Sequence, residues 1–91
     1  MASKAEIGWV RRSEEGERFE HFARKVGKQW KFFIRQRRFE QWQSVENPPL
    51  EDWLELLEAL RRLVVRRRYQ PDDVERLLRT IRERFPEAEV E

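Results

Sequence analysis

The sequence predicts an all-α fold, a small three- to four-helix bundle in which helices 2 and 3 form an αα-hairpin. Two observations lead to this prediction. Apolar residues recur every three or four positions through most of the chain, which is the spacing of amphipathic helices. Prolines in helix-starting or helix-ending contexts divide the chain at Pro48-Pro49, Pro71 and Pro86. The length of 91 residues suits one domain, so we expect a single helical domain over residues 1–91.

The N-terminal part, residues 1–12, is expected to be a loose arm. Its apolar residues Ile7, Trp9 and Val10 could hold it against the core or form a short edge strand. Ser13 then precedes two glutamates, a context typical of a helix N-cap with acids in the first turn. We therefore expect the first helix to begin directly after the arm.

A long or kinked helix 1 is predicted over residues 14–43. Its apolar positions step by threes and fours and are Phe19, Phe22, Ala23, Val26, Trp30, Phe33 and Ile34. The pattern then fails, because Arg37 would fall on the core face. The helix either kinks near residues 36–38 or continues straight with a second aromatic face. A hairpin over residues 30–45 fits an alternation of apolar residues, but we rank it lower because no glycine or asparagine marks its turn.

Two further helices are predicted with clearer boundaries. Helix 2 covers residues 48–67, starting at a proline that suits the first helical position. Its apolar arc exceeds half of the circumference, which indicates burial on two sides or contact with a partner. Helix 3 covers residues 71–85 with one narrow apolar stripe, and Pro86 ends it. The remaining residues 86–91 are expected to be a frayed tail.

The composition argues against catalysis and metal binding. The chain has no Cys and one His, so disulfides are excluded, a zinc site is nearly excluded, and we expect no cofactor. His21 falls opposite the apolar stripe of the predicted helix, so we expect it to be exposed. No phosphate-cradling or nucleophile motif is present, and carboxylates gather at predicted helix starts, where the helix dipole explains them. We therefore expect a non-enzymatic protein.

No segment has the composition of a membrane span or a signal peptide. The longest apolar runs, such as Phe32-Phe33-Ile34, are far shorter than the ~20 residues that a spanning helix needs. The N-terminus has no apolar region of the signal-peptide kind. We therefore expect a cytoplasmic location.

Basic and aromatic residues are concentrated in residues 24–42. Seven basic residues and five aromatic rings lie in this segment, a mixture typical of proteins that bind polyanions or single-stranded nucleic acid. The residues that we expect to contact such a ligand are Lys28, Lys31, Arg35, Arg38, Phe32 and Phe39. A second basic cluster at residues 61–68 is explained mainly by the negative end of the helix 2 dipole.

Two functions follow from these patterns. The first is a small helical protein-interaction module, able to self-associate as a homodimer, because the apolar surface exceeds what so short a chain can cover. Its candidate interface residues are Trp42, Leu56 and Leu63. The alternative is a protein that binds RNA or another single strand through the basic and aromatic segment 24–42.

Overall fold

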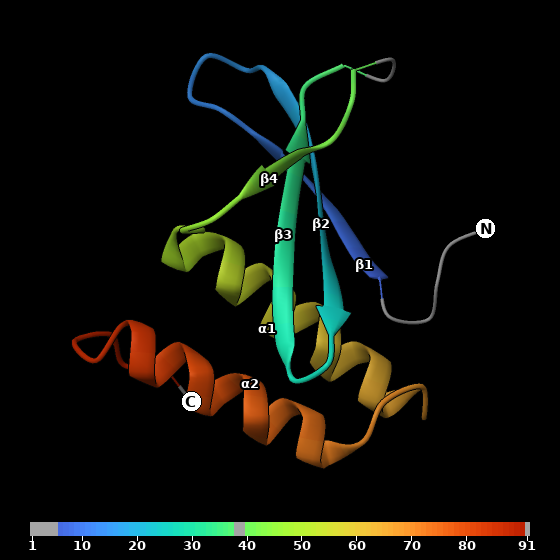
Figure 1. Ribbon diagram of the computed structural model, residues 1–91, viewed down its shortest axis with the longest axis vertical. Coiled ribbons are helices and arrows are strands. Elements are labelled where there is room, and N and C mark those ends of the chain that lie inside the picture. The colour runs from blue at the N-terminus through green and yellow to red at the C-terminus, as the bar shows by residue number, and fades with distance from the viewer. Residues whose placement is uncertain (1–5, 38–39, 91) are drawn as a thin grey trace. The chain divides into compact units, whose positions relative to one another are not determined.

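The fold is α+β. The computed structural model describes residues 6–37 and 40–90, which belong to two compact units, Met1–Pro48 and Pro49–Glu91. The first unit contains a four-stranded antiparallel sheet and the second contains two helices (Figure 1). The all-α prediction is therefore wrong for the N-terminal half of the chain.

The sheet is a simple meander. Its strands are β1 (Glu6–Arg12), β2 (Arg18–Val26), β3 (Gln29–Arg35) and β4 (Gln43–Val45). Their order in the sheet is β1-β2-β3-β4, and every neighbouring pair is antiparallel. Sequential strands are thus neighbours in space, as short hairpin connections require. Of the two possibilities considered for the N-terminal arm, the structure shows the edge strand, β1.

The turn between β2 and β3 explains why this segment is not helical. Val26 pairs with Gln29, so the loop consists of Gly27 and Lys28 alone. Gly27 has a φ of +62°, which matches the first central position of a type II′ turn, and glycine followed by any residue is the signature of that turn. The twist of this turn matches that of the strands on either side. The glycine that a helix would tolerate only at a cost therefore directs a hairpin.

The connection between β1 and β2 also depends on a glycine. Ser13 and Glu17 close this loop, because the Ser13 N–H donates to the Glu17 carbonyl at 2.9 Å. Gly16 has a φ of +86°, in the left-handed region that other residues rarely adopt. The Ser13 hydroxyl accepts a hydrogen bond from the Glu17 N–H at 3.1 Å, so Ser13 stabilises a strand connection instead of capping a helix.

Helix 1 over residues 14–43 was predicted because both faces of the sheet carry apolar side chains. Successive side chains of a strand point to opposite faces. Phe22 and Phe33 lie on one face, whereas Ala23 and Ile34 lie on the other. Along the sequence, the apolar residues of the two faces together are spaced three and four positions apart, which is also the spacing of one apolar stripe on a helix. The hairpin over residues 30–45, which was ranked lower, corresponds to the observed pairing of β3 with β4.

The second unit is a helical hairpin close to the predicted one. Helix α1 (Leu50–Val65) and helix α2 (Pro71–Arg84) lie within the predicted ranges 48–67 and 71–85. The apolar side chains of this unit that are at most 5% exposed come from the predicted stripes and are Trp53, Leu56, Leu57, Leu60, Leu77, Leu78 and Ile81. The carboxylate residue Asp52 of α1 is also buried, at 3% exposed, although the predicted apolar stripe does not include it. A capping box starts α2, in which Gln70 and Asp73 exchange side chain-to-backbone hydrogen bonds.

Candidate nucleic-acid interface

The strand register assigns the sheet residues to two faces with different surroundings. One face, the Ile7 face, includes Ile7, His21, Ala23 and Phe32, all of which are at most 6% exposed. The burial of His21 corrects the expectation that this residue is exposed. Its ring stacks on Trp9 with the ring centroids 5.7 Å apart and the planes nearly parallel. The imidazole is thus part of a buried aromatic contact.

The opposite face carries half-exposed aromatic rings together with basic side chains. We call it the Phe22 face and define it by Phe22, Arg24, Lys31, Phe33, Arg35 and Trp42. The first five residues come from β2 and β3, and Trp42 joins them from the loop before β4. The three rings are neither buried nor fully exposed. A ligand could therefore reach their accessible edges and faces.

The rings of the Phe22 face form one cluster. Phe22 and Phe33 are direct cross-strand partners, and their rings stack at 4.6 Å with an interplanar angle of 13°. Trp42 meets Phe22 edge-on at 4.7 Å. Cross-strand aromatic pairs of this kind stabilise a sheet by roughly 0.2–1 kcal/mol. In the same row, the neighbours Gly8 and Ser44 are small and exposed, so no larger side chain of that row covers the Phe pair.

Two arginines lie over these rings. The guanidinium of Arg24 is 5.4 Å from the centroid of Phe22 and 5.6 Å from that of Phe33. The guanidinium of Arg35 is 4.3 Å from the centroid of Trp42, well within cation–π range. Guanidinium planes and aromatic rings are both surfaces on which nucleic-acid bases stack. The Phe22 face therefore presents two kinds of stacking surface close together.

Carboxylates hold the two guanidinium groups in place. Arg24 Nε donates to Glu6 Oε2 at 2.9 Å, and Arg35 Nη2 donates to Glu20 Oε2 at 3.3 Å. Both acids lie directly across the strands from their partners. The Arg24–Glu6 pair is exposed and adds at most about 1 kcal/mol, whereas the Arg35–Glu20 pair is part-buried, and both restrict where the guanidinium points. The arginines are thus preoriented over the rings.

The strand residues on the Phe22 side of the sheet have a positive balance. Arg12, Arg18, Arg24, Lys31 and Arg35 face two carboxylates, Glu6 and Glu20, which leaves a net charge of +3. Lys31 is exposed and forms no ion pair with any other described residue. It is therefore available to an external anion without first breaking an internal contact.

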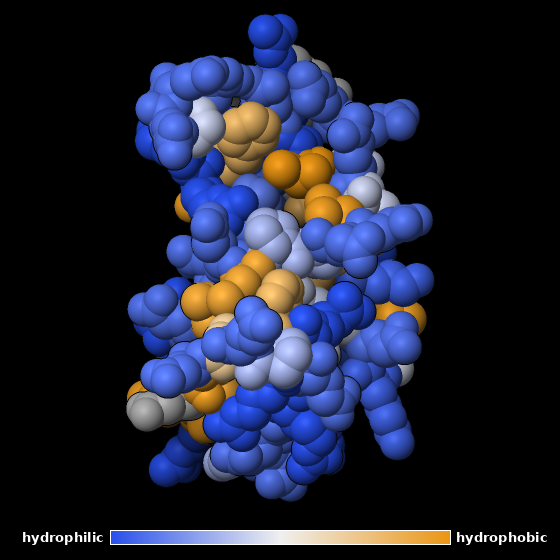
Figure 2. Space-filling model, turned by 90° about the vertical axis from the view of Figure 1, so that its left-hand side faces the viewer, coloured by the Kyte–Doolittle hydropathy of each residue, from blue (hydrophilic) through white to orange (hydrophobic). Residues whose placement is uncertain are grey.

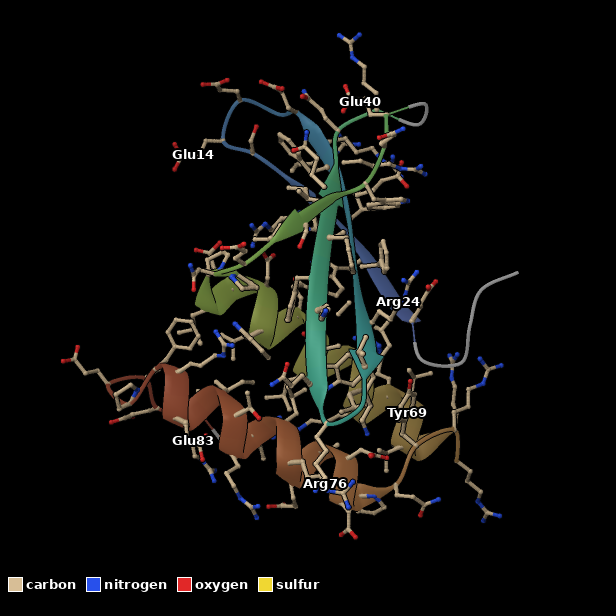
Figure 3. The ribbon with its side chains drawn as sticks, in the orientation of Figure 1. Glu14, Arg24, Glu40, Tyr69, Arg76 and Glu83 are labelled. Carbon is tan, nitrogen blue, oxygen red and sulfur yellow. The ribbon has the colours of Figure 1, made fainter. Side chains whose placement is uncertain are left out.

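The acidic groups of the sheet unit gather mainly in its loops. Figure 3 shows Glu14 and Glu40 on loops at one end of the sheet, whereas Arg24 lies towards the β2–β3 turn. The exposed Lys28 is in that turn. The turn end of the sheet therefore carries the basic groups of Arg24 and Lys28, which would attract an anionic strand.

The structure brings together some of the predicted ligand-binding residues and separates others. Lys31 and Arg35 lie on the Phe22 face, and Lys28 lies in the adjoining turn. Phe32 points to the Ile7 face and is 4% exposed, so it cannot stack on a ligand at the Phe22 face. The remaining two predicted residues, Arg38 and Phe39, lie outside the described residues.

The three predicted protein-interface residues have different surroundings. Trp42 is half-buried within the Phe22 face. Leu56 is 0% exposed and belongs to the buried stripe of α1, while Leu63 is half-buried. On the side of the molecule shown in Figure 2, apolar residues form small patches separated by hydrophilic ones.

Sequence reasoning missed Phe22 and Phe33 as members of the surface that carries Arg24 and Lys31. The signal that could have identified them is the Gly27-Lys28 turn. A two-residue hairpin loop at these positions pairs Phe22 with Phe33 and Arg24 with Lys31, and this is the observed register. Recognition of the turn would therefore have assembled most of the Phe22 face from the sequence alone.

Other kinds of site have little support in the described part of the chain. Residues 6–37 and 40–90 contain no group of three or more His, Asp or Glu side chains that could hold a metal ion. Neither α1 nor α2 has the length and hydropathy of a helix that crosses a bilayer. Burial, with the Asp73 carboxylate nearby, raises the pKa of Tyr69 above its usual value, and this residue lies between the helices, in the second unit.

Comparisons with protein families, curated protein sequences and solved structures found no match to this chain.

Proposed function

We propose that this protein binds single-stranded nucleic acid, RNA in the first place, on the Phe22 face of its sheet. The observation that carries the proposal is the arrangement of Arg24 over Phe22 and Phe33, with Arg35 over Trp42. Proteins that bind single strands combine basic side chains for the phosphates with aromatic side chains for the bases. The proposal takes the protein to be non-enzymatic and cytoplasmic.

Each part of the Phe22 face has a role in this proposal. Trp42 and the Phe pair supply ring surface, and stacking of one base on an aromatic side chain contributes about 1–3 kcal/mol. Lys31, which has no carboxylate partner among the described residues, contacts a phosphate. The guanidinium planes of Arg24 and Arg35 offer both a stacking surface and charge. Base edges are not read by any of these contacts, so we expect weak sequence preference.

The direct test is fluorescence anisotropy of a labelled single-stranded RNA oligonucleotide at several salt concentrations. The wild-type protein should bind at low salt, with an affinity that falls steeply as salt rises. Trp42→Ala should weaken binding about tenfold or more, because one stacking contact is lost. Trp30→Ala is the matched control, since Trp30 is also half-exposed but lies on the Ile7 side of the sheet.

Circular dichroism would show that both tryptophan variants keep their fold. Absence of binding by the wild-type protein at low salt would falsify the proposal. Equal losses in Trp42→Ala and Trp30→Ala would contradict the location on the Phe22 face. Arg35→Lys refines the test, because lysine keeps the charge but loses the planar group, so affinity should fall by a smaller factor than with Trp42→Ala.

Self-association is a second candidate function, and one observation favours it. Strand β1 has a single neighbour, β2, in the order of the sheet, so its other edge carries backbone groups that no described strand pairs. This seven-residue strand has no proline, and a second copy of the chain could extend the sheet there. Light scattering at micromolar concentration tests this candidate. A monomer under those conditions would exclude it, and Gly8→Pro should abolish a dimer formed in this way.

A further inference from the structure

We propose that the arginine turn after α1, residues Arg66, Arg67 and Arg68, is a second phosphate-binding surface for single-stranded nucleic acid. It lies in the helical unit and shares no residue with the Phe22 face. The choice of ligand class rests on the proposed function. The charge and the backbone conformation of the turn support the proposal independently.

The backbone of the turn has an unusual residue at its centre. Arg67 has a φ of +62° and is the only described residue other than glycine with a positive φ. The Arg68 N–H donates to the Leu63 carbonyl and the Arg67 N–H to the Val64 carbonyl, both at 2.9 Å. This is the Schellman arrangement at a helix end, in which glycine is the usual residue at the left-handed position. An arginine at this position has a conformational cost relative to glycine, and a binding role of its side chain would explain why arginine occurs there.

The charge of the turn is not neutralised within the described chain. Arg66, Arg67 and Arg68 are all exposed, and none forms an ion pair with another residue in ranges 6–37 and 40–90. The backbone N–H groups of the turn are already used by helix carbonyls, so they do not form an anion site. The guanidinium groups are therefore the part of the turn that can bind phosphate.

The surroundings favour nucleic acid over a lipid surface. A helix end that inserts into a membrane needs several exposed apolar side chains. Here Val65, at 83% exposed, is the one exposed large apolar residue next to the turn. A nucleic-acid strand offers one phosphate per nucleotide, and each guanidinium group can contact a phosphate with two hydrogen bonds.

The test compares the thermal stability and the RNA affinity of one variant, Arg67→Gly. Glycine relieves the left-handed strain, so the midpoint of thermal unfolding should rise by roughly 4 °C. Loss of one phosphate contact should weaken binding of a labelled single-stranded RNA about tenfold and reduce the slope of log affinity against log salt by about 0.7. Arg79→Gln, an exposed site on α2, is the charge-matched control and should leave affinity unchanged.

The outcomes separate this inference from the proposal for the Phe22 face. A more stable Arg67→Gly protein with wild-type affinity would mean that the turn has a structural role only. Weaker binding to vesicles containing phosphatidylserine, with unchanged RNA affinity, would assign the turn to membranes and overturn the inference. If Arg67→Gly weakens RNA binding while Trp42→Ala does not, the turn is supported and the sheet site fails. If the wild-type protein binds no RNA, both fail.

Discussion

The sheet unit and the helical unit differ in how many faces of their elements carry apolar side chains. In α1 and α2 the deeply buried apolar residues lie along one stripe, which in α1 also includes the buried Asp52. In β2 and β3 both faces carry rings, such as Phe22 on one and Phe32 on the other. When an element has one apolar face, the spacing of its apolar residues shows whether it is a helix or a strand. When a strand has two apolar faces, the combined spacing of its apolar residues can resemble that of a helix. The second apolar face of the sheet, the Phe22 face, is also the candidate binding surface.

The largest expected effect concerns the single buried stripe of the helical unit. Leu60 is 0% exposed, so Leu60→Ala should destabilise the protein by about 2–5 kcal/mol through lost burial and a cavity. Leu54, on the same helix but 39% exposed, is the matched control, and Leu54→Ala should cost much less. Urea denaturation monitored by circular dichroism measures both. Equal costs at the two positions would contradict a one-sided α1.

A sign test distinguishes the hairpin from the helix that the sequence pattern favoured. If Gly27 lay inside a helix, Gly27→Ala would stabilise the protein by about 1 kcal/mol. At the observed φ of +62° the same change should destabilise it by about 1–2 kcal/mol. A Cβ atom there would have nothing within 4 Å, so the effect is one of backbone conformation alone. Lys28→Ala in the same turn is the control, and denaturation gives the sign.

The smallest expected effect is the pH response of Tyr69 in the helical unit. Burial first, and then the nearby Asp73 carboxylate, raise the pKa of the phenol in the folded state. The stability due to the neutral phenol is fully present below its unfolded pKa of about 10 and falls as the pH rises through the folded pKa. Tyr69 is the chain's only tyrosine, so its ultraviolet absorbance reports this titration directly. Tyr69→Phe should remove this part of the pH dependence, and a titration at or below pH 10 would contradict it.

The helical hairpin was predictable because its signals are local. Prolines mark both starts, acids occupy both first turns, and each apolar stripe has one phase. In the sheet unit, Gly27-Lys28 is a local signal for a two-residue hairpin turn. The spacing of the apolar residues around it also fits a helix, so the turn was not predicted. Of the candidate site, the basic residues of segment 24–42 were identified from the sequence, and Trp42 was predicted as a protein-interface residue. Phe22 and Phe33 were assigned to a helical core stripe instead, because their membership depends on pairing across the hairpin.

By itself the sequence determined the two helices and the segment of the chain in which basic and aromatic residues concentrate. Helix signals act over one or two turns, and composition needs no fold. Only the tertiary structure decided that β1, β2, β3 and β4 form a sheet and which of their rings share a face. The physical reason is that a strand acquires its hydrogen bonds and side-chain neighbours from another strand. Phe32 and Phe33 are adjacent in the chain, yet one is buried and the other faces Phe22 and Arg24.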